Sequence, residues 1–169
     1  MQLIGQGIFG EAYYDFFGWS VDISSDGKTV AIGAPGLWND RPGYVQVFYL
    51  ESDDFGSSWK QLGQDITGDA NGDQFGVSIS LSDDGKTLAI GAEYNNGNGE
   101  SSGHVRVYRM DDSSTSWTQV GEDIDGEASG DYSGVSVSLS ADGTTVAIGA
   151  PWYDDNGENS GHVRIFSVK

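Results

Sequence analysis

Residues 134–150 read GVSVSLSADGTTVAIGA, and this stretch decides the fold. From 135 to 139, valine and leucine alternate with serine, which is the period-two pattern of a strand with one apolar face. Asp142-Gly143 follows, and this pair suits a two-residue hairpin turn in which both central residues take positive φ. A second strand, Thr145-Val146-Ala147-Ile148-Gly149-Ala150, follows the turn, so the stretch predicts a β-hairpin.

The hairpin belongs to a unit that occurs three times with a period of 58 residues, as shown by Gly18, Gly76 and Gly134. A third strand is expected at 161–166, and the second copy adds a fourth strand over 117–124. Four antiparallel strands per repeat are typical of a β-propeller blade. The sequence therefore predicts an all-β protein, with a single repeat domain over residues 1–169 and blade units at approximately 3–60, 61–118 and 119–169.

Short motifs at the strand ends resemble a known repeat. Phe17-Gly18 and Phe75-Gly76 begin first strands, and Gly33-Ala34-Pro35 and Gly149-Ala150-Pro151 end second strands. This pattern resembles the FG-GAP repeat of integrin-type propellers (integrin alpha N-terminal-like), with single-copy departures at Ser133-Gly134 and Gly91-Ala92-Glu93. The resemblance implies a propeller that recognises other molecules through loops on one face, and it does not imply an enzyme.

The same resemblance bears on calcium, because blades of this family often carry a calcium loop between their first two strands. Here that connection is only a short hairpin in each unit, as in Ser140-Ala141-Asp142-Gly143. A hairpin of this length cannot supply the roughly 6–8 oxygen ligands of Ca²⁺. We expect the integrin-type calcium cage to be absent and no cofactor to be required.

The net charge of −18, from 8 Lys and Arg against 26 Asp and Glu, argues against nucleic-acid and anionic-lipid partners. Membrane insertion is not expected, because no run approaches the roughly 18 apolar residues of a membrane helix. The stretch Met1 to Gly10 lacks the features of an export signal, and the absence of cysteine removes disulfides and thiol chemistry. An acidic, turn-rich surface suits an extracellular or cell-surface setting.

Three blades are fewer than the 4–8 or so of known propellers. Residues 2–8 align with a fourth strand that has no blade of its own, whereas the third unit lacks that strand. We therefore expect a homodimer that closes a six-bladed ring by strand exchange, with residues 2–8 as the clasp of the partner's last blade. Two alternatives are a β-trefoil-like monomer and a fragment of a longer propeller.

Two sets of long loops are expected on one face of the blades, and they mix acidic with aromatic residues. This mixture suits a non-catalytic recognition module that binds a protein or carbohydrate ligand in adhesion; the alternative is a structural scaffold that only oligomerises. The candidate ligand-binding residues are Trp38, Tyr94, Trp152, Tyr153, Asp73 and Asp131.

Two of these loops are rich in the hard oxygen ligands that Ca²⁺ prefers, although neither has the spacing of an EF-hand loop. The candidate metal ligands are Asp69, Asn71, Asp73, Asp154, Asp155 and Glu158. His104 and His162 occupy the same position of two repeats, which indicates a structural role. No catalytic residue is predicted, because nothing in the sequence singles out a general acid–base pair or a nucleophile.

Overall fold

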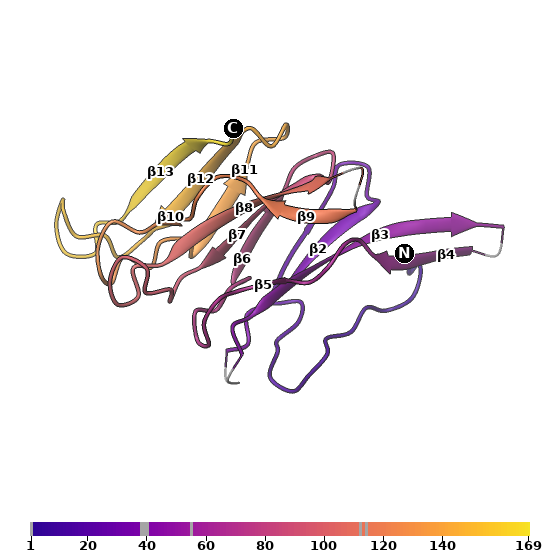
Figure 1. Ribbon diagram of the computed structural model, residues 1–169, viewed down its shortest axis with the longest axis horizontal. Coiled ribbons are helices and arrows are strands. Elements are labelled where there is room, and N and C mark those ends of the chain that lie inside the picture. Colours follow the sequence, from indigo (N-terminus) through magenta and orange to yellow (C-terminus); the bar gives the residue numbers. More distant parts are fainter. Residues whose placement is uncertain (1, 38–40, 55, 112, 114) are drawn as a thin grey trace.

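The chain folds into three antiparallel β-sheets that lie side by side in sequence order (Figure 1). A computed structural model describes residues 2–37, 41–54, 56–111, 113 and 115–169. All regular structure in these residues is β-strand. They contain no helix that is long and apolar enough to cross a membrane.

The first two sheets are complete blades with the same plan. Each is a meander of three strands, and its outer edge is formed by two shorter strands that both pair with the third. Blade 1 contains β1 (Ser20–Ile23), β2 (Thr29–Ala34), β3 (Tyr44–Asp53), β4 (Gly56–Gln61) and β5 (Ile66–Thr67). Blade 2 contains β6 (Ser78–Leu81), β7 (Thr87–Ala92), β8 (His104–Asp111), β9 (Ser116–Gln119) and β10 (Ile124–Asp125).

Blade 3 has only the three-stranded meander of β11 (Ser136–Leu139), β12 (Thr145–Ala150) and β13 (His162–Ser167). The outer edge of β13 therefore has no partner strand in the described chain. Residues 2–8, which were expected to form a fourth strand, contain no strand residue here. They lie against blade 1, where the Gln6 side chain hydrogen-bonds both the amide and the carbonyl of Trp59.

The fourth strand of each complete blade is interrupted, whereas the alternation over 117–124 predicted it as continuous. Gly63 and Gly121 lie in the interruptions with φ of 79° and 73°, which is a left-handed conformation that strand residues do not adopt. The chain bends there and then pairs with the third strand again. This bend brings Leu62 of blade 1 to Trp117 of blade 2, whose indole Nε1 donates to the Leu62 carbonyl at 3.0 Å.

The hairpin turn differs from the prediction in two respects. The connection is longer than two residues, because β11 ends at Leu139, β12 begins at Thr145, and the Gly143 amide donates to the Ser140 carbonyl within it. Gly27, Gly85 and Gly143 have φ between 67° and 71°, but the aspartate before each glycine does not have positive φ. The reason is a side-chain bond: Asp142 accepts from the hydroxyl of Ser140 and from the amide and hydroxyl of Thr144. These bonds hold the carboxylate ionised and lower the pKa of Asp142 to about 2.

The apolar core lies between the blades. One cluster joins Val45 and Val47 of blade 1 to Phe75, Leu88 and Ile90 of blade 2, and a second joins blades 2 and 3. The blades approach closely because Gly33 and Gly91 leave space for the neighbouring backbone, as shown by the 2.1 Å that would separate a Cβ on Gly91 from the Gly134 carbonyl oxygen.

Among the described residues, all strand pairing occurs within a blade, apart from one isolated bridge between Gly103 and Ser133. A β-trefoil would require strands of different units to pair in a common barrel. The trefoil alternative is therefore wrong, and the three sheets are blades of a β-propeller.

Candidate functional site

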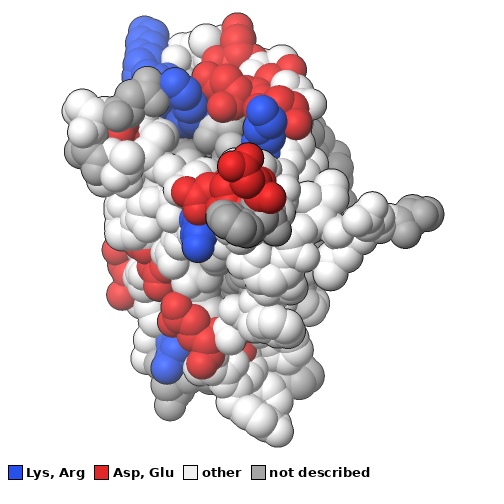
Figure 2. All heavy atoms as spheres, turned by 90° about the vertical axis from the view of Figure 1, so that its right-hand side faces the viewer, with Lys and Arg blue, Asp and Glu red and all other residues white. Residues whose placement is uncertain are grey.

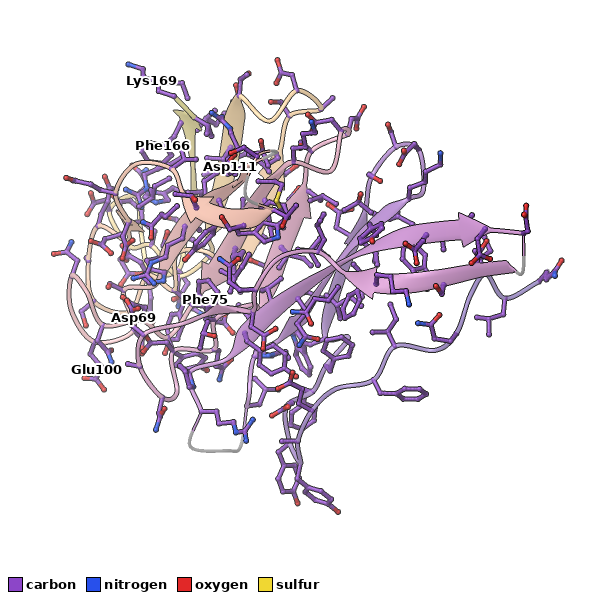
Figure 3. The ribbon with its side chains drawn as sticks, turned by 45° about the vertical axis from the view of Figure 1, so that its right-hand side comes forward. Asp69, Phe75, Glu100, Asp111, Phe166 and Lys169 are labelled. Atoms are coloured by element: carbon purple, nitrogen blue, oxygen red, sulfur yellow. The ribbon has the colours of Figure 1, made fainter. Side chains whose placement is uncertain are left out.

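The two sets of long loops do lie on one face, where direct hydrogen bonds join them. The loop that enters blade 3 is held by the loop of blade 2: the Gly130 and Tyr132 amides donate to Glu100 and Ser101, and the Ser129 hydroxyl donates to Glu100. Figure 3 shows Asp69 and Glu100 at this end of the sheets, opposite Phe166 and Lys169. We call this end the loop face.

Three repeat-related aspartates, Asp15, Asp73 and Asp131, are buried beneath the loop face, with at most 4% of each exposed. Asp131 accepts from the Ala128 amide at 2.8 Å, and Asp73 accepts from the Asn95 side chain at 2.7 Å. These carboxylates hold the loops in shape. The assignment of Asp73 and Asp131 to ligand binding stays a prediction, and their burial gives them a structural role.

An aromatic row crosses from blade 2 to blade 3 on the loop face. Tyr132 packs edge-on against Tyr94, with ring centroids 5.2 Å apart, and on its other side it meets Trp152 at 5.0 Å. Trp152 is 44% exposed and Tyr94 is 40% exposed, so the row presents ring surface to solvent. We refer to these three residues as the aromatic row.

A second aromatic group lies on the loop that enters blade 1. Tyr13, Tyr14, Phe16 and Trp19 form successive ring contacts with centroids 4.9 to 6.2 Å apart. Tyr14 and Phe16 have φ of 60° and 53°, a conformation that is uncommon for bulky residues. Phe16 occupies the repeat position of Tyr132, which also has positive φ at 52°.

Of the predicted ligand-binding residues, the structure therefore brings Tyr94 and Trp152 together. Tyr153 lies apart from the row and stacks on His162 at 3.8 Å, and its hydroxyl donates to Asp155. Trp38 lies outside the described residues. The prediction missed Tyr132, which joins the other two rings; its equivalence to Phe16 across the repeats is the signal that could have found it.

Four of the six predicted metal ligands, Asp69, Asp73, Asp154 and Asp155, are engaged in other contacts. Asp69 pairs with the Arg106 guanidinium, which also binds Asp123, and these bonds lower the pKa of both carboxyls. Asp154 accepts from the Asn159 amide at 2.7 Å, which shapes its own loop. Calcium binding at the predicted residues stays a prediction.

Across the described ranges, the acidic and histidine side chains whose ligand atoms gather within 4.8 Å of one another are His104, Asp123 and Asp125. Arg106 already donates to Asp123 at 2.8 and 2.7 Å. A cation bound here would therefore have to share the Asp123 carboxylate with the positively charged guanidinium. The group is better described as a structural ion-pair cluster.

His104 lies at the edge of this cluster, 2% exposed, with Nδ1 3.7 Å from the Asp123 carboxylate. Its Nε2 is buried and has no hydrogen-bond partner among the described residues. Burial, aided by the charge of Arg106, lowers the pKa of His104 below its usual 6.5 despite Asp123.

This lowered pKa predicts a pH-dependent loss of stability. Below about pH 6.5 the unfolded chain binds a proton at His104 that the folded chain binds only at lower pH, so acidification favours unfolding. We expect the free energy of unfolding to fall more for the wild type than for His104→Asn between about pH 7.5 and 5. Urea unfolding at each pH measures this, and parallel curves for the two proteins would contradict it.

The fold and the loop face define a class, that of β-propeller modules which bind other molecules through loops at one end of the blades. The FG-GAP repeat family matches the chain at residues 10–48, 67–108 and 123–166, which together make up most of its length. The chain belongs to the FG-GAP repeat family, as the motifs at its strand ends predicted. A search of curated proteins gave no match.

Proposed function

We propose that this chain is a non-catalytic recognition module whose loop face binds a protein ligand carrying positive charge. The observation that carries the proposal is the aromatic row, in which Tyr132 supports the partly exposed rings of Tyr94 and Trp152. Rings fixed by their neighbours give a large contact area at little cost in side-chain entropy, which is why aromatic residues dominate binding hot spots.

The charge of the molecule favours a cationic ligand. The loops of the loop face also carry exposed acidic residues, which are Glu11, Asp69, Glu100, Glu127, Asp154, Asp155 and Glu158. With a net charge of −18, the field of the chain attracts lysine- and arginine-rich segments and speeds their association. Cations also bind aromatic ring faces. The second candidate, a carbohydrate, shares the aromatic contact but gains nothing from the charge.

An array that carries both lysine- and arginine-rich peptides and neutral glycans tests this proposal. We expect cationic peptides to bind, and Trp152→Ala to weaken that binding about tenfold or more, because truncating a central aromatic residue commonly has an effect of this size. Tyr49→Ala is the matched control, since Tyr49 is a partly exposed aromatic residue on β3, away from the loop face.

Each outcome of the array assigns the site differently. Hits confined to neutral glycans that are lost with Trp152→Ala would move the ligand class to carbohydrates. A silent array, or hits that survive Trp152→Ala, would contradict the proposal and favour the structural scaffold. FG-GAP repeats are typical of extracellular proteins, and we propose adhesion at or outside the cell surface as the setting.

A further inference from the structure

The first and the last blade each expose residues whose repeat equivalents are buried between two blades. Val45 and Val105, at the same repeat position of blades 1 and 2, are both 0% exposed, whereas their equivalent Val163 on blade 3 is 66% exposed. Two residues further along the same strands, Val107 of blade 2 is 3% exposed, whereas its equivalent Ile165 of blade 3 is 70% exposed. These positions are buried only where another blade covers them.

The opposite end of the row has a matching open face on blade 1. Leu81 of blade 2 is 7% exposed, and its equivalent Ile23 of blade 1 is 53% exposed. Val21 on the same strand is 65% exposed. Figure 1 shows these two faces at opposite ends of the molecule, with β13 at one end and blade 1 at the other.

The two interfaces inside the chain share one register of hydrogen bonds. The hydroxyls of Ser20 and Ser78 donate to the carbonyls of Gly76 and Gly134 of the next blade, at 2.7 and 2.6 Å. The amides of Ser25 and Asp83 donate to Asp83 and Ala141 of the next blade, at 3.0 and 2.9 Å. Each blade therefore has one face that supplies the serine hydroxyl and another that supplies the glycine carbonyl.

Blade 3 and blade 1 leave one face of each kind open. Continuing the repeat places Ser136 of blade 3 opposite the Gly18 carbonyl, and the Ala141 amide opposite Ser25. Val163 and Ile165 would cover the apolar face of β2. We propose that blade 3 docks on blade 1 of a second copy of this chain in this register, so that two copies form a closed six-bladed ring.

The outer edge of blade 3 fits the same arrangement. In blades 1 and 2, Ile66 pairs with Val45 and Ile124 pairs with Val105. The repeat equivalent of Ile66 and Ile124 is Ile8, and the equivalent of the two valines is Val163. Residues 2–9 of the second copy thus supply the strand that β13 lacks, with Ile8 opposite Val163. The open outer edge of β13 would then be paired in both copies.

A second copy is the occupant that the chemistry favours. Its two open faces carry the groups that the internal interfaces join, and six blades lie within the range of known propellers. The docking faces contain small and apolar residues, and much of the surface at the blade 1 end is neither acidic nor basic (Figure 2), whereas each copy has a net charge of −18. The copies therefore repel at long range, and association should strengthen as salt screens that repulsion.

Light scattering behind a sizing column gives the first test. We expect a particle near twice 18.0 kDa that persists on dilution and becomes more stable to dilution with added salt. A particle of 18.0 kDa at every concentration and salt level would overturn the proposal. A dimer that weakens with salt would also overturn it, because a contact between charged groups would then hold the copies together.

Gly149→Ala tests the docking face without disturbing the blades. In the free chain a Cβ at Gly149 would meet the hydroxyl end of the Ser136 side chain at 2.3 Å and no backbone atom nearer than 3.8 Å. The equivalent Cβ on Gly33 would lie 2.2 Å from the Gly76 carbonyl oxygen across the blade interface. In the proposed dimer, Gly149→Ala would therefore meet Gly18 of the second copy.

We expect Gly149→Ala to weaken the dimer about tenfold or more while the circular dichroism and thermal midpoint of the chain at low concentration stay unchanged. Ile165→Lys should act in the same way, because its side chain is exposed in the free chain and buried in the dimer. Glu158→Lys on the loop face is the control, and it should leave the dimer intact. Dimers of full strength in both interface variants would overturn the assigned face.

Cross-linking tests the register of the clasp. The chain has no cysteine, so the pair Ile8→Cys and Val163→Cys would form a disulfide between copies only if these residues meet. We expect oxidation to give a covalent dimer on a non-reducing gel. Ile8→Cys with Ser167→Cys is the control, because Ser167 lies at the position of Tyr49, which pairs with Lys60. Equal cross-linking of both pairs would refute this register.

Discussion

Replacing Trp117 with alanine is expected to lower the free energy of unfolding by about 3–5 kcal/mol, as is typical for a buried tryptophan. Trp117 is 4% exposed and belongs to the core cluster between blades 1 and 2. Its indole also satisfies the Leu62 carbonyl, and its backbone exchanges two hydrogen bonds with the Gln64 side chain. The substitution removes apolar contacts and leaves a polar group of the neighbouring blade without its donor.

Trp59→Ala is the matched control, because Trp59 occupies the same repeat position of blade 1. Its indole makes the equivalent bond to the Ile4 carbonyl at 3.0 Å, but the ring is only partly buried, against residues 2–8. We expect a loss of about 1–2 kcal/mol. Urea unfolding of both variants, at concentrations where each is monomeric, measures the difference. Equal losses would show that Trp117 gains nothing from the interface between the blades.

Gly91→Ala is expected to destabilise the chain by about 3 kcal/mol or more, at the upper end of the range for overpacked sites. A Cβ on Gly91 would lie 2.1 Å from the carbonyl oxygen of Gly134, which is backbone of the neighbouring blade. A backbone atom cannot rotate away, so blades 2 and 3 would have to separate. The measurement is the thermal or urea midpoint of the variant.

Gly149→Ala again supplies the control, since the same methyl group at this position of blade 3 meets no neighbouring blade in the free chain. We expect a change of less than about 1 kcal/mol in the monomer, because only the Ser136 hydroxyl has to rotate. A Gly91→Ala chain as stable as wild type would mean that the blades do not pack at the distance described here.

Local sequence patterns predicted the repeat, the hairpins and the number of blades, because each depends on neighbours a few residues away. The alternation at 135–139 and the Asp-Gly pairs identified β11 and its turn within a residue or two. The same reasoning extended the fourth strand through Gly121, and it assigned positive φ to aspartates whose side chains hold them in an ordinary turn. A glycine inside a polar stretch does not reveal by itself whether the chain bends there.

The candidate site was predicted only in part, because the burial of a loop residue depends on partners that the local sequence does not show. The sequence indicated that the long loops share one face, and it selected Tyr94 and Trp152. It also selected Asp73 and Asp131 from the mixture of acidic and aromatic residues in these loops, yet both are buried beneath the loops. The difference arises from the Ala128 amide and the Asn95 side chain, which provide hydrogen bonds that compensate for burying the polar carboxyl groups.

The sequence by itself determined that this protein is a repeat of small antiparallel sheets with acidic, aromatic loops, because strand periodicity, turn residues and net charge are local or additive properties. Only the tertiary structure decided which residues meet across the blades, where Gly91 admits the Gly134 backbone and Trp117 reaches Leu62. It also decided that Val163 and Ile165 remain exposed while their equivalents are buried. Burial depends on which neighbour covers a strand, and no single repeat contains that information.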